Sequence, residues 1–254
     1  MVRLDNNRNR LRGTLMHLSR IVFHPDTYPT REHYPFNLDI FHRTAEIALN
    51  RPVTMFVGEN GTGKSTLLEA VARKAGIHIW QDYGRTRFQY NPYENKFHRC
   101  ISVEWADGRV PGSFFGSSVF HDFARILDEW AAADPALLEY FGGKSLLTQS
   151  HGQSIMSFFK ARYEIKGLYL MDEPETALSP ATQIALLKLL ARMAAAGHAQ
   201  FIIATHSPIL LACPGAAIYC FDEVPIQPIA YEQTRHYQTY KDFMNDPHKY
   251  CDDR

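Results

Sequence analysis

A glycine-rich segment near residue 60 has the residue types and spacing of a phosphate-binding loop. It reads Gly58, Glu59, Asn60, Gly61, Thr62, Gly63, Lys64, Ser65 and Thr66. Glycines let backbone N–H groups approach phosphate oxygens closely, and the N-terminus of a following helix adds partial positive charge. At the fixed positions of this GxxxxGK[ST] pattern, Lys64 is expected to reach the β- and γ-phosphates and Ser65 to coordinate Mg²⁺. The pattern therefore predicts binding of ATP with Mg²⁺.

Two acidic residues follow an apolar run much later in the chain. The run Leu168–Met171 leads directly into Asp172 and Glu173. Such a run predicts a buried strand, whose end would deliver both carboxylates beside the phosphate loop. Asp172 then suits a magnesium ligand, and Glu173 suits a general base that polarises the attacking water. The alternative, an acidic helix cap near Pro174, leaves the co-occurrence with a phosphate loop unexplained.

Strands and helices must alternate along the chain to position these motifs. Buried or half-buried strands are expected at Val53–Val57, Ile101–Trp105, Gly167–Met171 and Phe201–Ala204. Helices are expected at Lys64–Ala75, Ser117–Ala133, Ser154–Tyr163 and Pro180–Ala196. This alternation predicts an α/β fold with a mostly parallel sheet flanked by helices. Residues 1–35 are rich in arginine and proline and are expected to form an irregular arm with one strand at Leu15–Phe23.

The order of the motifs resembles that of ABC-type ATPases. After the phosphate loop come Ser150-His151-Gly152-Gln153, Asp172-Glu173, Ala177-Leu178-Ser179-Pro180 and Ala204-Thr205-His206-Ser207. More closely, the chain resembles a family of small stand-alone bacterial ATPases with the motifs GENGxGKSTLLEA, QSHGxS, LDEPExALSP and FIIATHSPILL. The resemblance runs from about Pro35 to the C-terminus. It includes Tyr231-Glu232 and His236-Tyr237, which the sequence connects to no mechanism.

The resemblance implies roles for residues outside the phosphate loop. Ser150 and Gly152 resemble signature residues that contact the γ-phosphate of ATP held by the other protomer of a head-to-tail homodimer. The general signature is LSGGQ, and here His151 replaces the first of its two glycines, which leaves the serine hydroxyl and a backbone N–H donor. His206 matches the switch histidine that hydrogen-bonds the γ-phosphate or the attacking water. Ser179 resembles a residue of the D-loop, which crosses the dimer interface.

Two elements of the family stay open in the sequence. The glutamine that senses Mg²⁺ and water is Gln81 or Gln89, and Gln81 is preferred because it follows the short apolar run Ile77–Trp80. The aromatic residue that stacks on adenine should precede the phosphate loop. Tyr34 and Phe36 are the candidates, and packing in the core is the preferred role for each.

The resemblance also defines the expected domain organisation. Residues 1–254 are expected to form a single P-loop NTPase domain of the ABC type. Within it, residues of about 112–165 would form a small helical subdomain that carries the signature. Roughly 85 residues separate Lys64 from Ser150, and they are rich in Gly, Pro and aromatic residues without a heptad run. That interval excludes a long coiled-coil rod of the condensin type.

Composition limits location and partners. Lysine plus arginine and aspartate plus glutamate both number 27, so the whole chain has no net attraction to nucleic acid or anionic lipid. No stretch approaches the ~18 apolar residues of a membrane span, and the first residues lack a secretory signal. The four cysteines form no CxxC pair, and reduced thiols in a cytoplasmic protein are expected. A local basic patch leaves nucleic acid open as a partner, with the residues Arg3, Arg8, Arg10, Arg12, Arg85, Arg87, Lys96 and Arg99.

The sequence leaves three purposes for the expected ATPase. The first is a soluble ATP-dependent switch in signalling, genome maintenance or phage defence, with an effector protein as a further partner. The second is the ATP-binding motor subunit of a transporter, which would need another chain in the membrane. The third is a nucleotide-binding module that does not hydrolyse ATP. The acid at Glu173 argues against the third, and the resemblance to stand-alone ATPases argues against the second.

Overall fold

The computed structural model describes residues 16–80, 91–93, 95–141, 143–148 and 151–250. The strands in these residues are β1 (Leu18–Phe23), β2 (Glu46–Ala48), β3 (Val53–Val57), β4 (Ile101–Trp105), β5 (Gly112–Gly116), β6 (Gly167–Asp172), β7 (Ala199–Ala204), β8 (Ala217–Cys220) and β9 (Gln227–Pro228). The α-helices are α1 (Asp39–Arg43), α2 (Lys64–Ala75), α3 (Ser117–Ala131), α4 (His151–Arg162), α5 (Pro180–Ala196), α6 (Pro208–Leu211) and α7 (Arg235–Asn245). Short 3-10 helices connect several of them.

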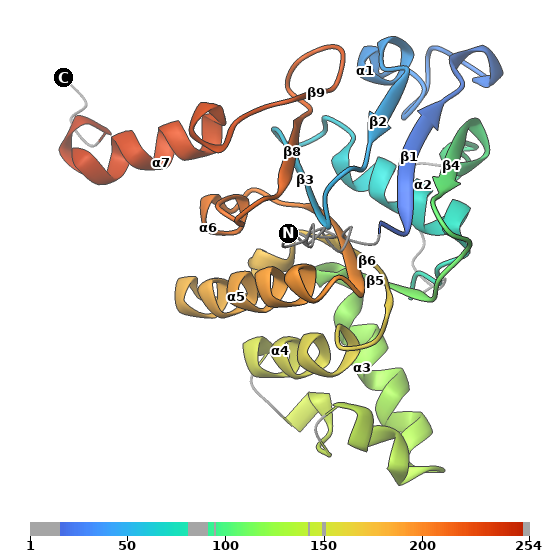
Figure 1. Cartoon of the computed structure of the whole chain (residues 1–254), viewed down its shortest axis with the longest axis vertical. Coiled ribbons are helices and arrows are strands. Elements are labelled where there is room, and N and C mark those ends of the chain that lie inside the picture. Colours follow the sequence, from blue (N-terminus) through green and yellow to red (C-terminus); the bar gives the residue numbers. More distant parts are fainter. Residues whose placement is uncertain (1–15, 81–90, 94, 142, 149–150, 251–254) are drawn as a thin grey trace, which may run out of the picture.

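The strands form two sheets (Figure 1). The larger sheet has the order β5-β6-β7-β3-β8-β9, and all its neighbours are parallel except β8 and β9. The smaller sheet has the order β2-β1-β4 and is antiparallel. In the larger sheet Ala204 pairs with both Phe56 and Asp172, so β3, β6 and β7 end at the same edge. The segments that follow these strands therefore meet, as ligand-binding loops do in parallel sheets.

The central strands are buried on both faces and divide their side chains between two cores. On β3, Met55 belongs to one core and Phe56 to the other, and on β7 the same holds for Ile203 and Ile202. The core of Phe56 is covered by α2 and the small sheet, and the core of Met55 is covered by α3, α4 and α5 (Figure 1). Near-continuous apolar strands of this kind are typical of parallel sheets covered on both faces.

Most expected elements are present close to their expected bounds. β3, β4, α2 and α5 begin and end at the predicted residues, and α4 starts three residues before the predicted Ser154. The strand of the N-terminal arm is β1, which pairs with β2 and β4. The expected mostly parallel α/β sheet flanked by helices is confirmed.

The expected helical subdomain requires a correction at its start. Residues 112–116 form β5, which lies in the larger sheet beside β6, so the helical segment begins at Ser117. The sequence does not predict this strand, because glycines stand at both of its ends. The structure shows why it is a strand: Phe114 and Phe115 are buried in opposite cores, as successive side chains of a strand must be.

The C-terminal segment differs from the rest of the chain. α7 projects from the body beyond α6, and none of its residues is buried (Figure 1).

The three cysteines that the structure describes, Cys100, Cys213 and Cys220, are buried free thiols. Within the described residues, no helix combines the length and apolar character that crossing a membrane requires.

Candidate functional site

The phosphate loop joins β3 to α2, and two of its glycines are required by close packing. Gly63 has φ of +99°, and a Cβ there would lie 2.6 Å from Cζ of Phe41. At Gly58, with φ of +153°, a Cβ would lie 3.0 Å from Cβ of Phe221 and from Oδ1 of Asp222. The same Asp222 oxygen accepts a hydrogen bond of 2.6 Å from the backbone N–H of Glu59. The body of the protein therefore holds the loop in shape at several points.

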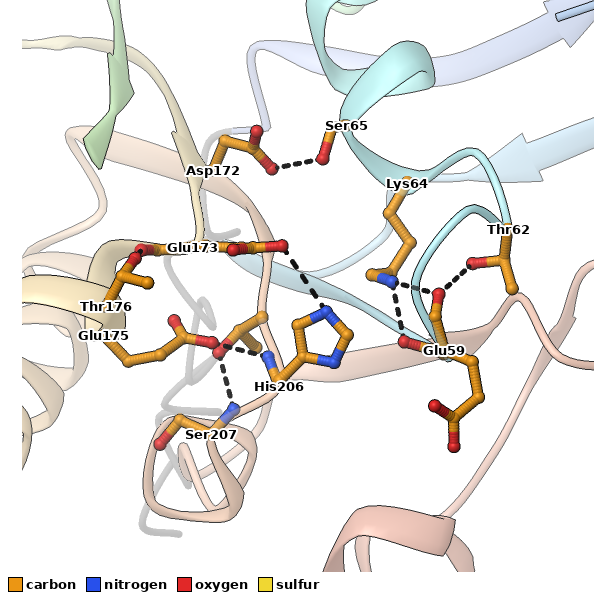
Figure 2. A network of polar contacts seen from close by, with 12 residues as sticks. Glu59, Thr62, Lys64, Ser65, Asp172, Glu173, Glu175, Thr176, His206 and Ser207 are labelled. Carbon is orange, nitrogen blue, oxygen red and sulfur yellow. Dashed lines mark hydrogen bonds and ion pairs between the residues drawn. The ribbon is translucent and has the colours of Figure 1, made fainter. Parts of the chain in front are cut away.

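Lys64 lies inside the phosphate loop (Figure 2). Its side chain is almost fully buried, and its Nζ donates hydrogen bonds to the backbone oxygens of Gly58 and Glu59 at 2.6 and 2.7 Å. Burial lowers the pKa of the Lys64 ammonium, and the nearby carboxylates of Glu173 and Asp222 act in the opposite direction. Because the ammonium bonds neutral carbonyls, an anion that entered the loop would gain a charge-assisted contact with it.

Ser65 and Asp172 meet where α2 begins and β6 ends. The Ser65 hydroxyl donates a hydrogen bond of 2.8 Å to Oδ1 of Asp172 (Figure 2). Burial raises the pKa of the Asp172 carboxyl to about 7, the Ser65 hydrogen bond opposes that rise, and Glu173 adds to it. Among the described residues, no three His, Cys, Asp or Glu side chains form a metal-binding cluster. One partly buried carboxylate beside a hydroxyl nevertheless fits Mg²⁺, which prefers few protein oxygens plus phosphates and water.

Glu173 has an unusual backbone conformation at the end of β6. Its φ of +44° and ψ of 55° place a residue other than glycine in the left-handed region. Its N–H donates to the oxygen of Ala204 at 2.9 Å, and its oxygen accepts a hydrogen bond from the hydroxyl of Thr176. The turn directs the carboxylate toward His206, with Oε1 3.5 Å from Nε2 (Figure 2). Backbone strain of this kind concentrates at functional sites.

His206 follows β7 and is held from its backbone as well as its ring. Its N–H donates to Oε1 of Glu175 at 2.6 Å, and burial lowers the pKa of its imidazole, with Lys64 acting in the same direction. Burial raises the pKa of the Glu175 carboxyl, which hydrogen bonds to His206 and Thr205 oppose. Sequence reasoning named Asp172 and Glu173 and missed Glu175. The available signal was the third acid in the same short run.

A second chain of hydrogen bonds joins the segment after β7, which carries His206 and Ser207, to the start of α5. The Ser207 hydroxyl donates to Oε1 of Gln183 at 2.6 Å, and Nε2 of Gln183 donates to the oxygen of Leu178 at 3.0 Å. The exposed residue Ser179 caps α5 by accepting a hydrogen bond from the N–H of Thr182 at 3.3 Å. The segment of Leu178 and Ser179 is thereby linked to the segment that carries His206.

The remaining predicted residues differ in where they lie. Ser150, Gln81 and Gln89 lie outside the described residues. Gly152 is in the first turn of α4, across the larger sheet from α2. The two candidates for stacking on adenine lie in different surroundings. Phe36 is fully buried in a core, which is the packing role expected for it.

Tyr34 lies at the phosphate loop instead. The residue is 41% exposed, and its hydroxyl contacts the hydroxyl of Thr66 in the first turn of α2. An exposed tyrosine beside the loop can contact a ligand, whereas the buried Phe36 cannot.

Two family models match segments of the chain that carry these motifs. Residues 36–73, which include the phosphate loop, match a model described as "AAA domain". Residues 151–212, which include both acids and His206, match a model described as "AAA domain, putative AbiEii toxin, Type IV TA system". No curated protein matches the sequence.

Solved structures match over most of the chain. One, titled "An inward-facing conformation of a putative metal-chelate type ABC transporter", has 19% identity and a TM-score of 0.51, over 89% of this chain and 88% of the other. The "SMC head domain from Thermotoga maritima" has 17% identity and a TM-score of 0.48, over 85% of this chain and all of the other. The first likeness shows the fold of an ABC-type domain. The fold and the two AAA-domain matches support an ATPase of the ABC/AAA P-loop type.

Proposed function

Starting from an ATPase domain of the ABC/AAA P-loop type, we propose that the protein hydrolyses Mg-ATP at the interface of a head-to-tail homodimer and acts as an ATP-dependent switch. The observation that carries this proposal is the convergence of three strand ends. The phosphate loop follows β3, Asp172 ends β6 with Glu173 directly after it, and His206 follows β7. A module that only bound nucleotide would not need a general base held against a histidine in a strained turn.

Binding begins at the phosphate loop. The backbone N–H groups of residues 58–66 and the N-terminus of α2 would surround the β- and γ-phosphates. Lys64 would exchange its bonds to two loop carbonyls for bonds to phosphate oxygens. The exposed ring of Tyr34, beside Thr66, would cover the nucleoside end. Ser65 and Asp172 would hold Mg²⁺, which neutralises charge on the β- and γ-phosphates when bound, and Gln81 remains the proposed additional ligand.

Hydrolysis then depends on Glu173 and His206. Glu173 would accept a proton from the attacking water as the bond to the γ-phosphorus forms. His206, whose Nε2 faces that carboxylate, would donate a hydrogen bond to the γ-phosphate or to the water. Glu175 would hold the backbone of His206 in place through its hydrogen bond of 2.6 Å. The chemistry is positioning and charge stabilisation, without a covalent enzyme intermediate.

The homodimer supplies the signature. Lys64 begins α2 on one face of the larger sheet, whereas Gly152 lies in α4, which packs in the core of the other face. That separation supports a signature, Ser150 and Gly152, that acts on ATP held by the partner. ATP would then bring two protomers together and hydrolysis would release them.

The setting of this switch is part of the proposal. The model that matches residues 151–212 carries the description of a toxin from a toxin–antitoxin system. That description favours a defence or signalling ATPase with an effector partner over a transporter motor. We expect a cytoplasmic location, in keeping with the chain's lack of an apolar segment long enough for a membrane span in the described residues.

Complementation between two inactive chains tests the proposal. Lys64→Ala damages the phosphate loop and Ser150→Arg blocks the signature, so each homodimer has two damaged sites. A mixed dimer places both changes in one composite site and leaves the other intact. Mixing should restore up to about a quarter of the wild-type ATPase activity, because half of the dimers are mixed and one of their two sites works.

Dimerisation is measured alongside. Glu173→Gln with Mg-ATP should be dimeric by light scattering, and the specific activity of the wild type should rise with protein concentration through the dimerisation range. Activity that is independent of concentration, with no restoration in proven mixed dimers, would reject the trans-acting signature. Full ATPase activity in both single variants would reject ATP hydrolysis at this site.

A further inference from the structure

The C-terminal tail, residues 231–250, contains side chains that have no role in the proposed reaction. Its first anchor is Tyr231, whose hydroxyl donates a hydrogen bond of 3.0 Å to the oxygen of Pro208, two residues after His206. Thr234 is 1% exposed and caps α7: its hydroxyl donates to the oxygen of Tyr231 at 2.7 Å and accepts from the N–H of Tyr237 at 3.3 Å. The rings of Tyr231 and Tyr237 lie 4.7 Å apart between centroids. The start of α7 is therefore fixed to the segment that carries the switch histidine.

This anchoring brings His236, in the first turn of α7, against the ring of His206. Nε2 of His236 lies 3.0 Å from Nδ1 of His206, which is hydrogen-bonding distance. Both imidazoles are partly buried, and burial lowers the pKa of each, so both favour the neutral form. Nδ1 of His236 is itself buried without a hydrogen-bonding partner among the described residues.

The surroundings decide which histidine donates. The other nitrogen of His206, Nε2, faces the carboxylate of Glu173, which in its ionised form can only accept hydrogen bonds. A proton on Nε2 leaves Nδ1 of a neutral His206 as an acceptor, so the hydrogen between the rings belongs to Nε2 of His236. Nε2 of His206 and Nδ1 of His236 are both buried without a hydrogen bond among the described residues, but only Nε2 of His206 has a carboxylate oxygen nearby, at 3.5 Å. The opposite arrangement would bury an N–H of His236 with no acceptor and would turn a bare nitrogen of His206 toward the carboxylate, which is costlier.

We propose that His236 is a positioning residue for the switch histidine: its Nε2–H bonds Nδ1 of His206 and holds that ring with Nε2–H directed at Glu173 and the terminal phosphate. This inference rests on the proposed hydrolytic function. It also assigns a purpose to the tail residues, since Tyr231, Thr234 and Tyr237 fix the turn from which His236 reaches the site. The ATPase site then includes α7, although α7 otherwise lies outside the body.

Steady-state kinetics of five variants in the full chain test the proposal. His236→Ala should lower kcat roughly three- to ten-fold, the worth of one hydrogen bond in the transition state, with KM for Mg-ATP changed by less than about two-fold. His236→Gln should restore most of the loss, because its amide N–H₂ reaches about as far as Nε2 of histidine and donates. His236→Asn is the matched control, since its amide is one methylene shorter and cannot reach. His206→Ala combined with His236→Ala should be no slower than His206→Ala alone.

The outcomes separate this inference from the function on which it rests. Wild-type kcat in His236→Ala, equal rescue by glutamine and asparagine, or an additional loss in the double variant would each overturn the positioning role of His236. Thermal unfolding of each variant identifies a loss that comes from misfolding, and rescue by glutamine alone excludes that origin. A wild-type chain without ATPase activity, or full activity in Lys64→Ala, would overturn hydrolysis at this site instead, whatever His236 does.

Discussion

The phosphate loop and the C-terminal tail reach the same site by different means. The loop lies between β3, whose five residues are all buried, and α2, which buries seven of its residues. The helix of the tail, α7, buries none and is joined to the body at its first turn by hydrogen bonds and ring contacts. The body therefore supplies the stability of the fold and the groups proposed to react, whereas the role proposed for the tail is to orient one ring. Substitutions in the two regions should differ accordingly.

Chemistry in the body should give the largest effect. Glu173→Gln removes the proposed general base and keeps the shape of the side chain, so turnover should fall roughly 10²–10⁴-fold while ATP still binds. Release of inorganic phosphate and binding of a fluorescent ATP analogue measure the two quantities. Glu164→Gln, at an exposed residue after α4, is the control and should keep wild-type turnover. Near-normal turnover in Glu173→Gln would assign water activation to another group, with His206 the first to examine.

Substitutions in the body and in the tail should also differ strongly in the unfolding free energy that they cost. Phe201 on β7 is fully buried against Tyr163 and Tyr169, and Phe201→Ala should cost about 3–5 kcal/mol of unfolding free energy, because a large ring leaves a cavity. Phe243 on α7 is 42% exposed, and Phe243→Ala should cost less than about 0.5 kcal/mol. Urea unfolding measures both. A loss at Phe243 that approached the loss at Phe201 would mean that α7 is part of the core and not an attached arm.

The same contrast explains what the sequence could predict. The strand Val53–Val57 and the helix Lys64–Ala75 were predicted at their observed bounds, because a continuous apolar run and a phosphate-loop motif are both local signals. The sequence predicted Asp172 beside the phosphate loop because it ends a buried apolar strand, and its hydrogen bond with Ser65 agrees with that placement. These features depend on neighbours in sequence or on a general property of sheets.

Features that depend on a single long-range contact were missed. Glu175 holds the backbone of His206. The sequence shows it only as the third acid of a short run, which does not distinguish a partly buried acceptor from a surface acid. The role of His236 depends on a hydrogen bond to His206, 30 positions away in the sequence. No sequence pattern indicates that contact. The exposed ring of Tyr34 and the buried ring of Phe36 are equally placed in sequence, and only packing tells them apart.

Nucleotide affinity should show a smaller but clear difference within one helix. Lys64→Ala removes the buried ammonium from the loop, and the Kd for Mg-ATP should rise at least ~10-fold, since hydrogen bonds to charged groups contribute about 1.5–3 kcal/mol. Lys74→Ala, in the last turn of α2, removes the same charge far from the loop and should keep the wild-type Kd. Titration calorimetry compares them. Equal affinity in Lys64→Ala and wild type would remove this loop as the phosphate site.

The smallest effect should come from the residue beside His236. Arg235 forms an ion pair with Glu59 of the phosphate loop at 3.3 Å, and the two side chains are 72% and 57% exposed. Water and salt screen such a pair, so Arg235→Ala should change kcat and the Kd for Mg-ATP by no more than about two-fold, and less at high ionic strength. Two adjacent residues of one helical turn then differ because the contact of Arg235 is exposed and electrostatic, whereas that of His236 is partly buried and directional. A loss of kcat in Arg235→Ala as large as in His236→Ala would mean that the tail acts through the general placement of α7. The hydrogen bond between the two histidines would then lose its special role.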